Sequence, residues 1–253
     1  MIPKIIHLCW ISGKRYPSKI RYCIKSWKKY NPDYEIMLWD ASSFDFDSIP
    51  WTREAMQAGK YAFVADYIRL YAVYNYGGIY LDSDVEVLKS FDNLLDKPYF
   101  LCTEAAEGKI ELAAFGAEKG TQWVKDALDY YDDRHFINED GSMNIVEQPK
   151  VIRAHLDGRY GFVPISDPSE FVVEPGRIRI LPIEWFCAHY EVADKLLYAV
   201  TENTYCVHHF SNSWVDAKRN VGLLHRIYYK LFRVDWEANY TWSPIVFQGK
   251  KRK

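Results

Sequence analysis

The chain has 253 residues, of which 49% are hydrophobic and 26% are charged, and its formal net charge is −2 at pH 7. This length can form one large α/β domain whose core needs no disulfide or structural metal. The nearly neutral charge gives no reason to expect nucleic acid as a partner. The five cysteines show neither zinc-site spacing nor a redox pair, which predicts reduced and mostly buried thiols.

The sequence predicts neither a signal peptide nor a transmembrane helix. Pro3, Lys4 and His7 interrupt the short apolar start, so a secretory signal is not expected. No apolar run of about 18 residues occurs, so no membrane-spanning helix is expected. These features predict a cytoplasmic protein.

The first elements alternate between strand and helix. Apolar residues 4–11 predict a buried strand, helical spacing predicts a helix over 17–30, and Asn31 with Pro32 ends that helix. Residues 34–39 predict a second strand. Strand, helix and strand within about forty residues are typical of a parallel α/β sheet.

The next helices end at a pair of glycines. Residues 42–53 are expected to form a loop, and 54–76 predict two helices broken near Gly59. Gly77 and Gly78 end the second helix and allow unusual backbone angles before the next strand. The later predicted elements are a short strand at 99–102, helices at 121–131 and 149–156, a loop at 132–148, a strand at 205–210 and a helix at 223–234.

Two carboxylates follow the strand after these glycines. Asp82 and Asp84 are separated by one residue, so they project to the same side of an extended segment. Two anionic oxygens on one side suit Mg²⁺ or Mn²⁺, which commonly arrives with a substrate diphosphate. An Asp-x-Asp motif also occurs by chance in surface turns, and this alternative stays open.

Asp66 and Arg69 lie on the preceding helix, three residues apart and therefore on one face. A surface ion pair is one interpretation of this spacing. The flanking residues are apolar on nearly every side, which instead predicts burial, and a buried pair must be satisfied by other groups. A ribose hydroxyl and a phosphate of a bound ligand would satisfy it.

Two histidines follow a late apolar strand. His208 and His209 come directly before a segment that contains Ser213 and Trp214. Either imidazole is a candidate third ligand for a metal held by the aspartates. A packed or solvated histidine is the alternative.

Taken together, residues 2–13, 62–91 and 208–214 resemble glycosyltransferase family 32, with a distant similarity to the large clostridial glucosylating toxins. The resemblance implies an α/β fold of the GT-A type, which binds nucleotide sugars and has a mostly parallel central sheet flanked by helices. The sequence shows no repeats and no convincing domain linker, which predicts a single domain over 1–253, with a C-terminal helix and basic tail at about 223–253.

The family's donor-binding roles fall on five residues of this sequence. The resemblance implies that Trp10 stacks on the nucleobase and that Tyr80 lies against the nucleoside. It implies that Asp66 and Arg69 hold the nucleoside and sugar. Asp82 would contact the ribose or the sugar and reach the metal through water.

The resemblance also implies a metal site and a covering loop. Asp84 would bind the ion directly, and His209 fits the C-terminal ligand better than His208 because it lies five residues before Trp214. Ser213 and Trp214 would cover the diphosphate. Asp82, Asp84 and Arg69 are the candidate catalytic residues.

The implied function is a metal-dependent retaining glycosyltransferase that uses Mn²⁺ or Mg²⁺ to stabilise a departing diphosphate. The transferred group would be a hexose. Trp10 and Tyr80 favour a UDP-sugar donor, although users of GDP-mannose exist in the group. The acceptor would be an oligosaccharide or a polyprenyl-diphosphate-linked saccharide in capsule or lipopolysaccharide synthesis. No protein nucleophile is expected.

Three alternatives accompany this interpretation. A haloacid-dehalogenase-like phosphatase also uses Asp-x-Asp, but that motif normally has Thr or Val where this chain has Glu86. A nucleotide- or sugar-binding module that lost turnover is the non-catalytic alternative. Residues 223–234 and the basic tail could contact the inner face of the membrane, or they could form an ordinary packed helix.

Overall fold

The computed structural model describes residues 1–104, 108–192, 195–210 and 245–247. A five-stranded central sheet has the order β2-β1-β3-β6-β5. Its strands are β1 (Ile5–Cys9), β2 (Glu35–Trp39), β3 (Gly78–Leu81), β5 (Tyr99–Phe100) and β6 (Ala114–Ala117). Strand β1 is parallel to β2 and β3, and β6 is antiparallel to β3 and β5, so only β6 is reversed. This confirms the prediction of a mostly parallel central sheet.

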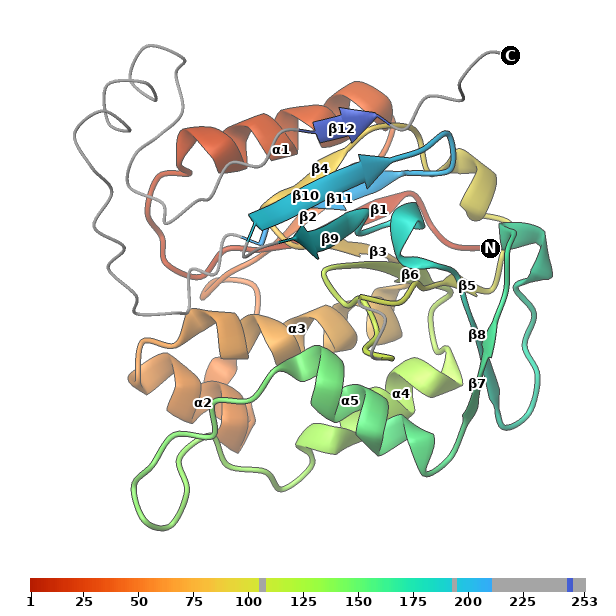
Figure 1. The fold of residues 1–253 in the computed structure, drawn as a ribbon. Coiled ribbons are helices and arrows are strands. Elements are labelled where there is room, and N and C mark those ends of the chain that lie inside the picture. The colour runs from red at the N-terminus through yellow and green to blue at the C-terminus, as the bar shows by residue number, and fades with distance from the viewer. Residues whose placement is uncertain (105–107, 193–194, 211–244, 248–253) are drawn as a thin grey trace, which may run out of the picture.

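Helices cover both faces of this sheet (Figure 1). On one face lies α1 (Ser18–Tyr30), whose buried Trp27 donates a hydrogen bond from Nε1 to the Val85 carbonyl at 2.7 Å. The helices on the other face are α2 (Pro50–Gln57), α3 (Tyr61–Tyr76), α4 (Gln122–Leu128) and α5 (Gln148–Asp157). Among the described helices, none combines the length and the apolar character needed to cross a membrane.

Helix α3 and strand β3 form a tight antiparallel unit. The helix is apolar on nearly all sides, and its interior residues are buried against the sheet. Gly77 and Gly78 have φ values of +69° and +102°, which residues with a side chain rarely adopt. A Cβ on Gly78 would also lie 2.7 Å from the Ile5 carbonyl oxygen. The turn therefore needs both glycines, and it returns the chain along α3 toward Arg69.

His7 in β1 is fully buried. Its side chain connects the glycine turn at Gly77 to strand β2. Its Nδ1 accepts a hydrogen bond from Trp39 Nε1 at 3.2 Å, and its Nε2 lies 2.7 Å from the Gly77 carbonyl oxygen. The proton therefore sits on Nε2. Burial lowers the pKa of His7 to about 4, although the hydrogen bond to Gly77 opposes this. The imidazole is neutral at pH 7.

Smaller sheets complete the described part of the chain. Strand β4 (Val85–Val87) pairs antiparallel with β11 (Cys206–His208), and β7 (Gly161–Pro164) pairs parallel with β8 (Arg177–Ile180). A third sheet contains β9 (His189–Val192), β10 (Lys195–Val200) and β12 (Ile245–Phe247). Short 3-10 helices lie at η1 (Phe46–Ser48), η2 (Asp92–Leu94), η3 (Asp129–Tyr131), η4 (Pro168–Glu170) and η5 (Ile183–Trp185).

Most of the predicted elements are confirmed, with small shifts at their ends. The predicted break near Gly59 separates α2 from α3, but α2 begins earlier than expected, at Pro50. None of the five cysteines is in a disulfide, and all except Cys9 are buried, as predicted. Strand β6 was not predicted. The predicted helix at 223–234 and the basic tail lie outside the described residues.

Candidate functional site

The candidate site lies where neighbouring strands of the sheet end. Strand β1 leads through α1 to β2 on one side, whereas its other neighbour is β3. In open α/β sheets, ligands bind beyond the carboxyl ends of strands at such a change of direction. Trp10 follows β1 and Asp82 follows β3, so both residues lie at this edge of the sheet.

A cavity of about 750 Å³ opens at this edge. That volume is within the usual range for small-molecule sites, roughly 300–1,000 Å³. The cavity brings together these predicted site residues: Trp10, Asp66, Arg69, Tyr80, Asp82 and Asp84. His208 also lines it, whereas His209 does not. The indole of Trp10 is held by a 2.7 Å hydrogen bond from its Nε1 to the Lys14 carbonyl.

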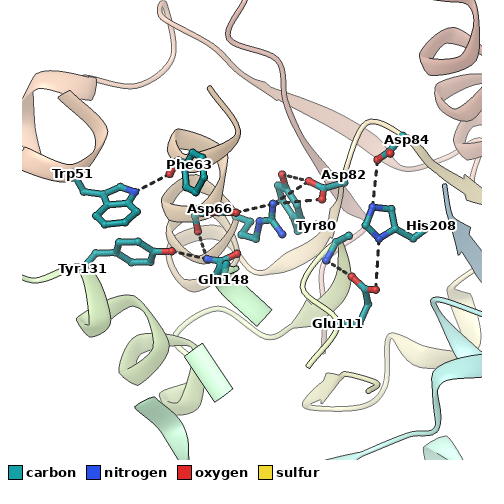
Figure 2. Close-up of polar contacts among 12 residues, drawn as sticks. Trp51, Phe63, Asp66, Tyr80, Asp82, Asp84, Glu111, Tyr131, Gln148 and His208 are labelled. Carbon is teal, nitrogen blue, oxygen red and sulfur yellow. Dashed lines mark hydrogen bonds and ion pairs between the residues drawn. The ribbon is translucent and has the colours of Figure 1, made fainter. Parts of the chain in front are cut away.

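Arg69 connects the predicted donor-binding residues Asp66 and Asp82, which Figure 2 labels. Its Nη2 lies 3.1 Å from Asp66 Oδ1 and 3.2 Å from Asp82 Oδ1. The Tyr80 hydroxyl donates to Asp82 Oδ1 at 2.8 Å, and the guanidinium lies 5.0 Å from the centre of the Tyr80 ring. The pair expected from the sequence is therefore present, with Arg69 buried and Asp66 partly buried, and a second carboxylate is added to it.

One buried guanidinium thus faces two partly buried carboxylates. Burial raises the pKa of Asp66 to about 7, although Arg69 opposes this. Burial also raises the pKa of Asp82, again against the effect of Arg69. Arg69 Nε is buried without a hydrogen-bond partner among the described residues. The cluster can therefore take up additional hydrogen bonds from a ligand.

Asp84 and His208 form the second half of the site. His208 Nε2 lies 3.6 Å from Asp84 Oδ1, and the ring of Phe210 packs against the imidazole at 4.0 Å. Burial opposes protonation of His208, but Asp84 and Glu111 outweigh it and raise the pKa of His208 to about 9. Without a metal the imidazole is therefore positively charged at pH 7.

The donor set fits a divalent cation. Asp82, Asp84 and His208 each offer one ligand atom, and these atoms all lie within 4.8 Å of one another. Carboxylates suit Mg²⁺ or Mn²⁺, and the imidazole nitrogen adds a ligand common in transition-metal sites. When an ion binds, it would take the place of the proton on His208 Nε2.

The placement of His209 corrects the prediction that it is the metal ligand. Its Nε2 lies 3.0 Å from Glu86 Oε2, and Glu86 also accepts a 2.7 Å hydrogen bond from Tyr22. Successive residues of a strand point to opposite faces. Because His208 ends β11 with its side chain toward the aspartates, His209 turns away toward α1. The structure thus places His208 in the position predicted for His209.

Two residues of the site were not singled out from the sequence. Glu111 is buried at the cavity wall, and its Oε2 lies 3.6 Å from His208 Nδ1. Gln148 donates to the Asp66 carbonyl at 2.5 Å and to the Tyr131 hydroxyl at 2.9 Å. A lone carboxylate within an apolar run could have indicated Glu111. No sequence signal marks Gln148. Ser213 and Trp214 lie outside the described residues.

Comparison with known proteins relates the sequence around this site to glycosyltransferases. Residues 17–101 match the family model "Glycosyltransferase sugar-binding region containing DXD motif". Inositol phosphoceramide mannosyltransferase 3 of Schizosaccharomyces pombe is 37% identical over 123 residues, covering 47% of this chain and 34% of that protein. Mannosyl phosphorylinositol ceramide synthase SUR1 of Saccharomyces cerevisiae is 32% identical over 105 residues, covering 40% and 27%.

The chain spans about a third of the length of these curated relatives. Among solved structures, PaToxG Glycosyltransferase aligns with a TM-score of 0.47 and 20% identity, covering 62% of this chain and 69% of that one. The strand order, the reversed β6 and the Asp-x-Asp motif at the end of β3 agree with the predicted GT-A type fold. Residues 17–101 are therefore similar to the sugar-binding region, containing a DXD motif, of a family of glycosyltransferases.

Proposed function

We propose that this protein is a metal-dependent, retaining glycosyltransferase that moves a hexose from a nucleotide sugar to a saccharide acceptor. The observation that supports this most directly is the position of Asp82, Asp84 and His208 in the same cavity as Arg69. A cation site suits a diphosphate, and a neighbouring cluster of carboxylates can accept hydrogen bonds from the hydroxyl groups of a sugar linked to it. The whole of residues 1–253 would act as one domain.

The residues of the cavity divide into a metal end and a sugar end. Asp84 and His208 would hold the ion, with Asp82 completing the set. A divalent cation, when bound, stabilises the charge that develops on a departing diphosphate. Arg69 keeps Asp66 and Asp82 oriented, so that their remaining lone pairs are available to hydroxyl groups of the sugar or ribose.

Two further residues would complete the donor site. Trp10 offers an indole fixed at one wall for stacking on the base. Gln148 Oε1 is buried without a partner among the described residues, so it can accept a hydrogen bond from a sugar hydroxyl. A front-face reaction needs no protein nucleophile, and none is assigned.

For the donor and the acceptor we propose classes of molecule. Trp10 and Tyr80 favour a UDP-hexose, while the names of the relatives bring mannose into consideration as the transferred sugar. The acceptor would be an oligosaccharide, free or lipid-linked, in surface polysaccharide synthesis. The protein would act in the cytoplasm, and residues 223–253 would contact the inner face of the membrane.

The test is metal-dependent turnover of nucleotide sugars by the purified protein. We expect release of nucleoside diphosphate with Mn²⁺, and loss of at least about a hundredfold in rate for Asp84→Asn. His209→Gln is the matched control, because its imidazole faces Glu86 rather than the cavity and should affect the rate far less. Absence of turnover with every donor, despite specific donor binding, would instead favour a non-catalytic binding module.

A further inference from the structure

Glu111 occupies an unusual position for a carboxylate. It is 1% exposed and lies at the wall of the cavity. Its Oε1 accepts a 2.6 Å hydrogen bond from the Ala113 backbone amide, and its own amide donates to the Cys102 carbonyl at 2.8 Å. These bonds fix the carboxylate on the segment before β6. Its second oxygen, Oε2, is buried without a hydrogen-bond partner among the described residues.

This oxygen faces the imidazole of His208, with which it forms a long ion pair. His208 Nδ1 is also buried without a hydrogen-bond partner in the described part of the chain, and it lies 3.6 Å from Glu111 Oε2. Figure 2 shows the imidazole between Asp84 on one side and Glu111 on the other. A small movement of either side chain would close this distance to a hydrogen bond. The two nitrogens of His208 are thus directed at two different carboxylates.

We propose that Glu111 is a positioning residue for the metal ligand His208, an inference that rests on the function proposed above. A metal can bind Nε2 only if that nitrogen has no proton, so the proton of the neutral imidazole must be on Nδ1. Glu111 Oε2 is placed to accept this proton in a hydrogen bond. Such an outer carboxylate fixes the tautomer and the ring orientation of a metal-binding histidine.

The substitution Glu111→Gln tests this inference because the Ala113 amide dictates how the new side chain lies. Ala113 N–H needs an acceptor, so the glutamine oxygen takes the place of Oε1 and the amide nitrogen faces His208. That nitrogen donates to Nδ1 and moves the imidazole proton to Nε2, where it blocks the metal. The variant keeps nearly the same shape as the native side chain.

The measurement is the dissociation constant for Mn²⁺, obtained by titrating the purified protein and following free Mn²⁺ by electron paramagnetic resonance. We expect Glu111→Gln to weaken binding by about 10–100-fold, the usual effect of losing such a partner. Glu104→Gln is the matched control, since Glu104 lines the same cavity and feels the charge of His208, but forms neither a hydrogen bond nor an ion pair with the imidazole among the described contacts. It should change the affinity by much less than tenfold. In a His208→Ala background, Glu111→Gln should have no further effect.

Several results would overturn the inference. Native-like Mn²⁺ affinity in Glu111→Gln would do so, as would an equal loss in Glu104→Gln. A second Mn²⁺ per chain that is lost in Cys187→Ala would also do so, because it would show that Glu111, Cys187 and His208, whose ligand atoms lie within 4.8 Å of one another, hold an ion themselves. If the glutamine variant does not fold, Glu111→Asp replaces it, and unchanged affinity there would contradict the proposal. If the native protein binds no Mn²⁺, the proposed function fails instead.

Discussion

Arg69 carries the positive charge at the end of the cavity that we propose binds the sugar. Its single positive charge is shared between Asp66 and Asp82, so the buried group of three carries an excess of negative charge when both carboxylates are ionised. Ion pairs of this kind are costly to bury unless other hydrogen bonds satisfy them. A ligand with several hydroxyl groups can supply such bonds. The cluster is therefore better suited to binding a sugar than to stabilising the fold.

His7 gives a residue-level prediction about pH. Its folded pKa is about 4, below the value of 6.5 that it has when unfolded, so the unfolded state binds more protons between these values. Stability therefore falls as the pH drops from about 6.5 toward 4. Between pH 7 and pH 5 we expect His7 to account for a loss of about 2 kcal/mol in the free energy of unfolding.

Urea unfolding of the native protein and of His7→Gln at both pH values measures this loss. Glutamine can donate to the Gly77 carbonyl but does not titrate, so the variant should lose less stability on acidification. Parallel curves for the two proteins would show that His7 is not the group responsible. Comparing the native protein with His7→Gln cancels the contribution of the other titratable groups, which are present in both proteins.

At the level of elements, the sequence predicted those with clear periodicity and missed those that depend on tertiary contacts. Strand β1, helix α1 and strand β2 have strong apolar patterns, and all three are present. Strand β6 contains Ala114, Phe115, Gly116 and Ala117, and small residues have low strand propensity. Its identity as a strand comes from its neighbours β3 and β5, which propensity cannot reveal.

The candidate metal site likewise combines features that the sequence predicts with others that depend on tertiary contacts. The Asp-x-Asp motif and the Asp66/Arg69 spacing are local, so they could be read from the sequence. The choice between His208 and His209 depends on the register of β11 against β4, in which His208 pairs with Val85. A shift of one residue reverses the face on which each side chain lies. Glu111 and Gln148 reach the cavity from other segments and carry no motif.

Gly116 in strand β6 gives a prediction about packing between neighbouring strands. A Cβ at this position would lie 2.4 Å from Phe100 Cε1 on the neighbouring strand β5. Gly116→Ala should therefore destabilise the protein by about 1–3 kcal/mol through overpacking. Because the obstacle is a side chain, Phe100→Leu in the same protein should recover part of the loss, giving a favourable coupling of roughly 1 kcal/mol in a double-mutant cycle.

Thermal unfolding of the two single variants and the double variant measures that coupling. Additive losses would mean that Gly116 is required for its backbone rather than for its lack of a side chain. Gly78→Ala is a useful contrast. Its new Cβ would meet the Ile5 carbonyl oxygen at 2.7 Å, and a φ of +102° adds strain, so no side-chain change should rescue it.

At the scale of the whole molecule, binding of the correct donor should increase the free energy of unfolding of the protein. The cavity joins residues that follow β1 and β3 at one edge of the central sheet with residues of α3 and β11, so a ligand there contacts segments distant in sequence. A donor present at about 100 times its dissociation constant stabilises the fold by about 2.7 kcal/mol. For a chain of this size that corresponds to a rise in Tm of roughly 5–10 °C.

A thermal-shift panel of UDP-hexoses and GDP-mannose, each with and without Mn²⁺, measures this rise and identifies the base. The expected result is a concentration-dependent shift for one donor that is larger when Mn²⁺ is present. In Asp84→Asn the additional shift caused by Mn²⁺ should disappear. Equal shifts for all nucleotides would indicate recognition of the diphosphate alone, contrary to a specific role for Trp10.

The pairing of β11 with β4 has a consequence for protein engineering. The segment that matches the family model ends at residue 101, yet the histidine beside the aspartates comes from Cys206–His208, where His208 pairs directly with Val85. Exchanging only the shared segment with that of a relative would separate the aspartates from the strand that matches them. A functional chimera must therefore transfer β4 and β11 together, as a single unit assembled from two distant pieces of the gene.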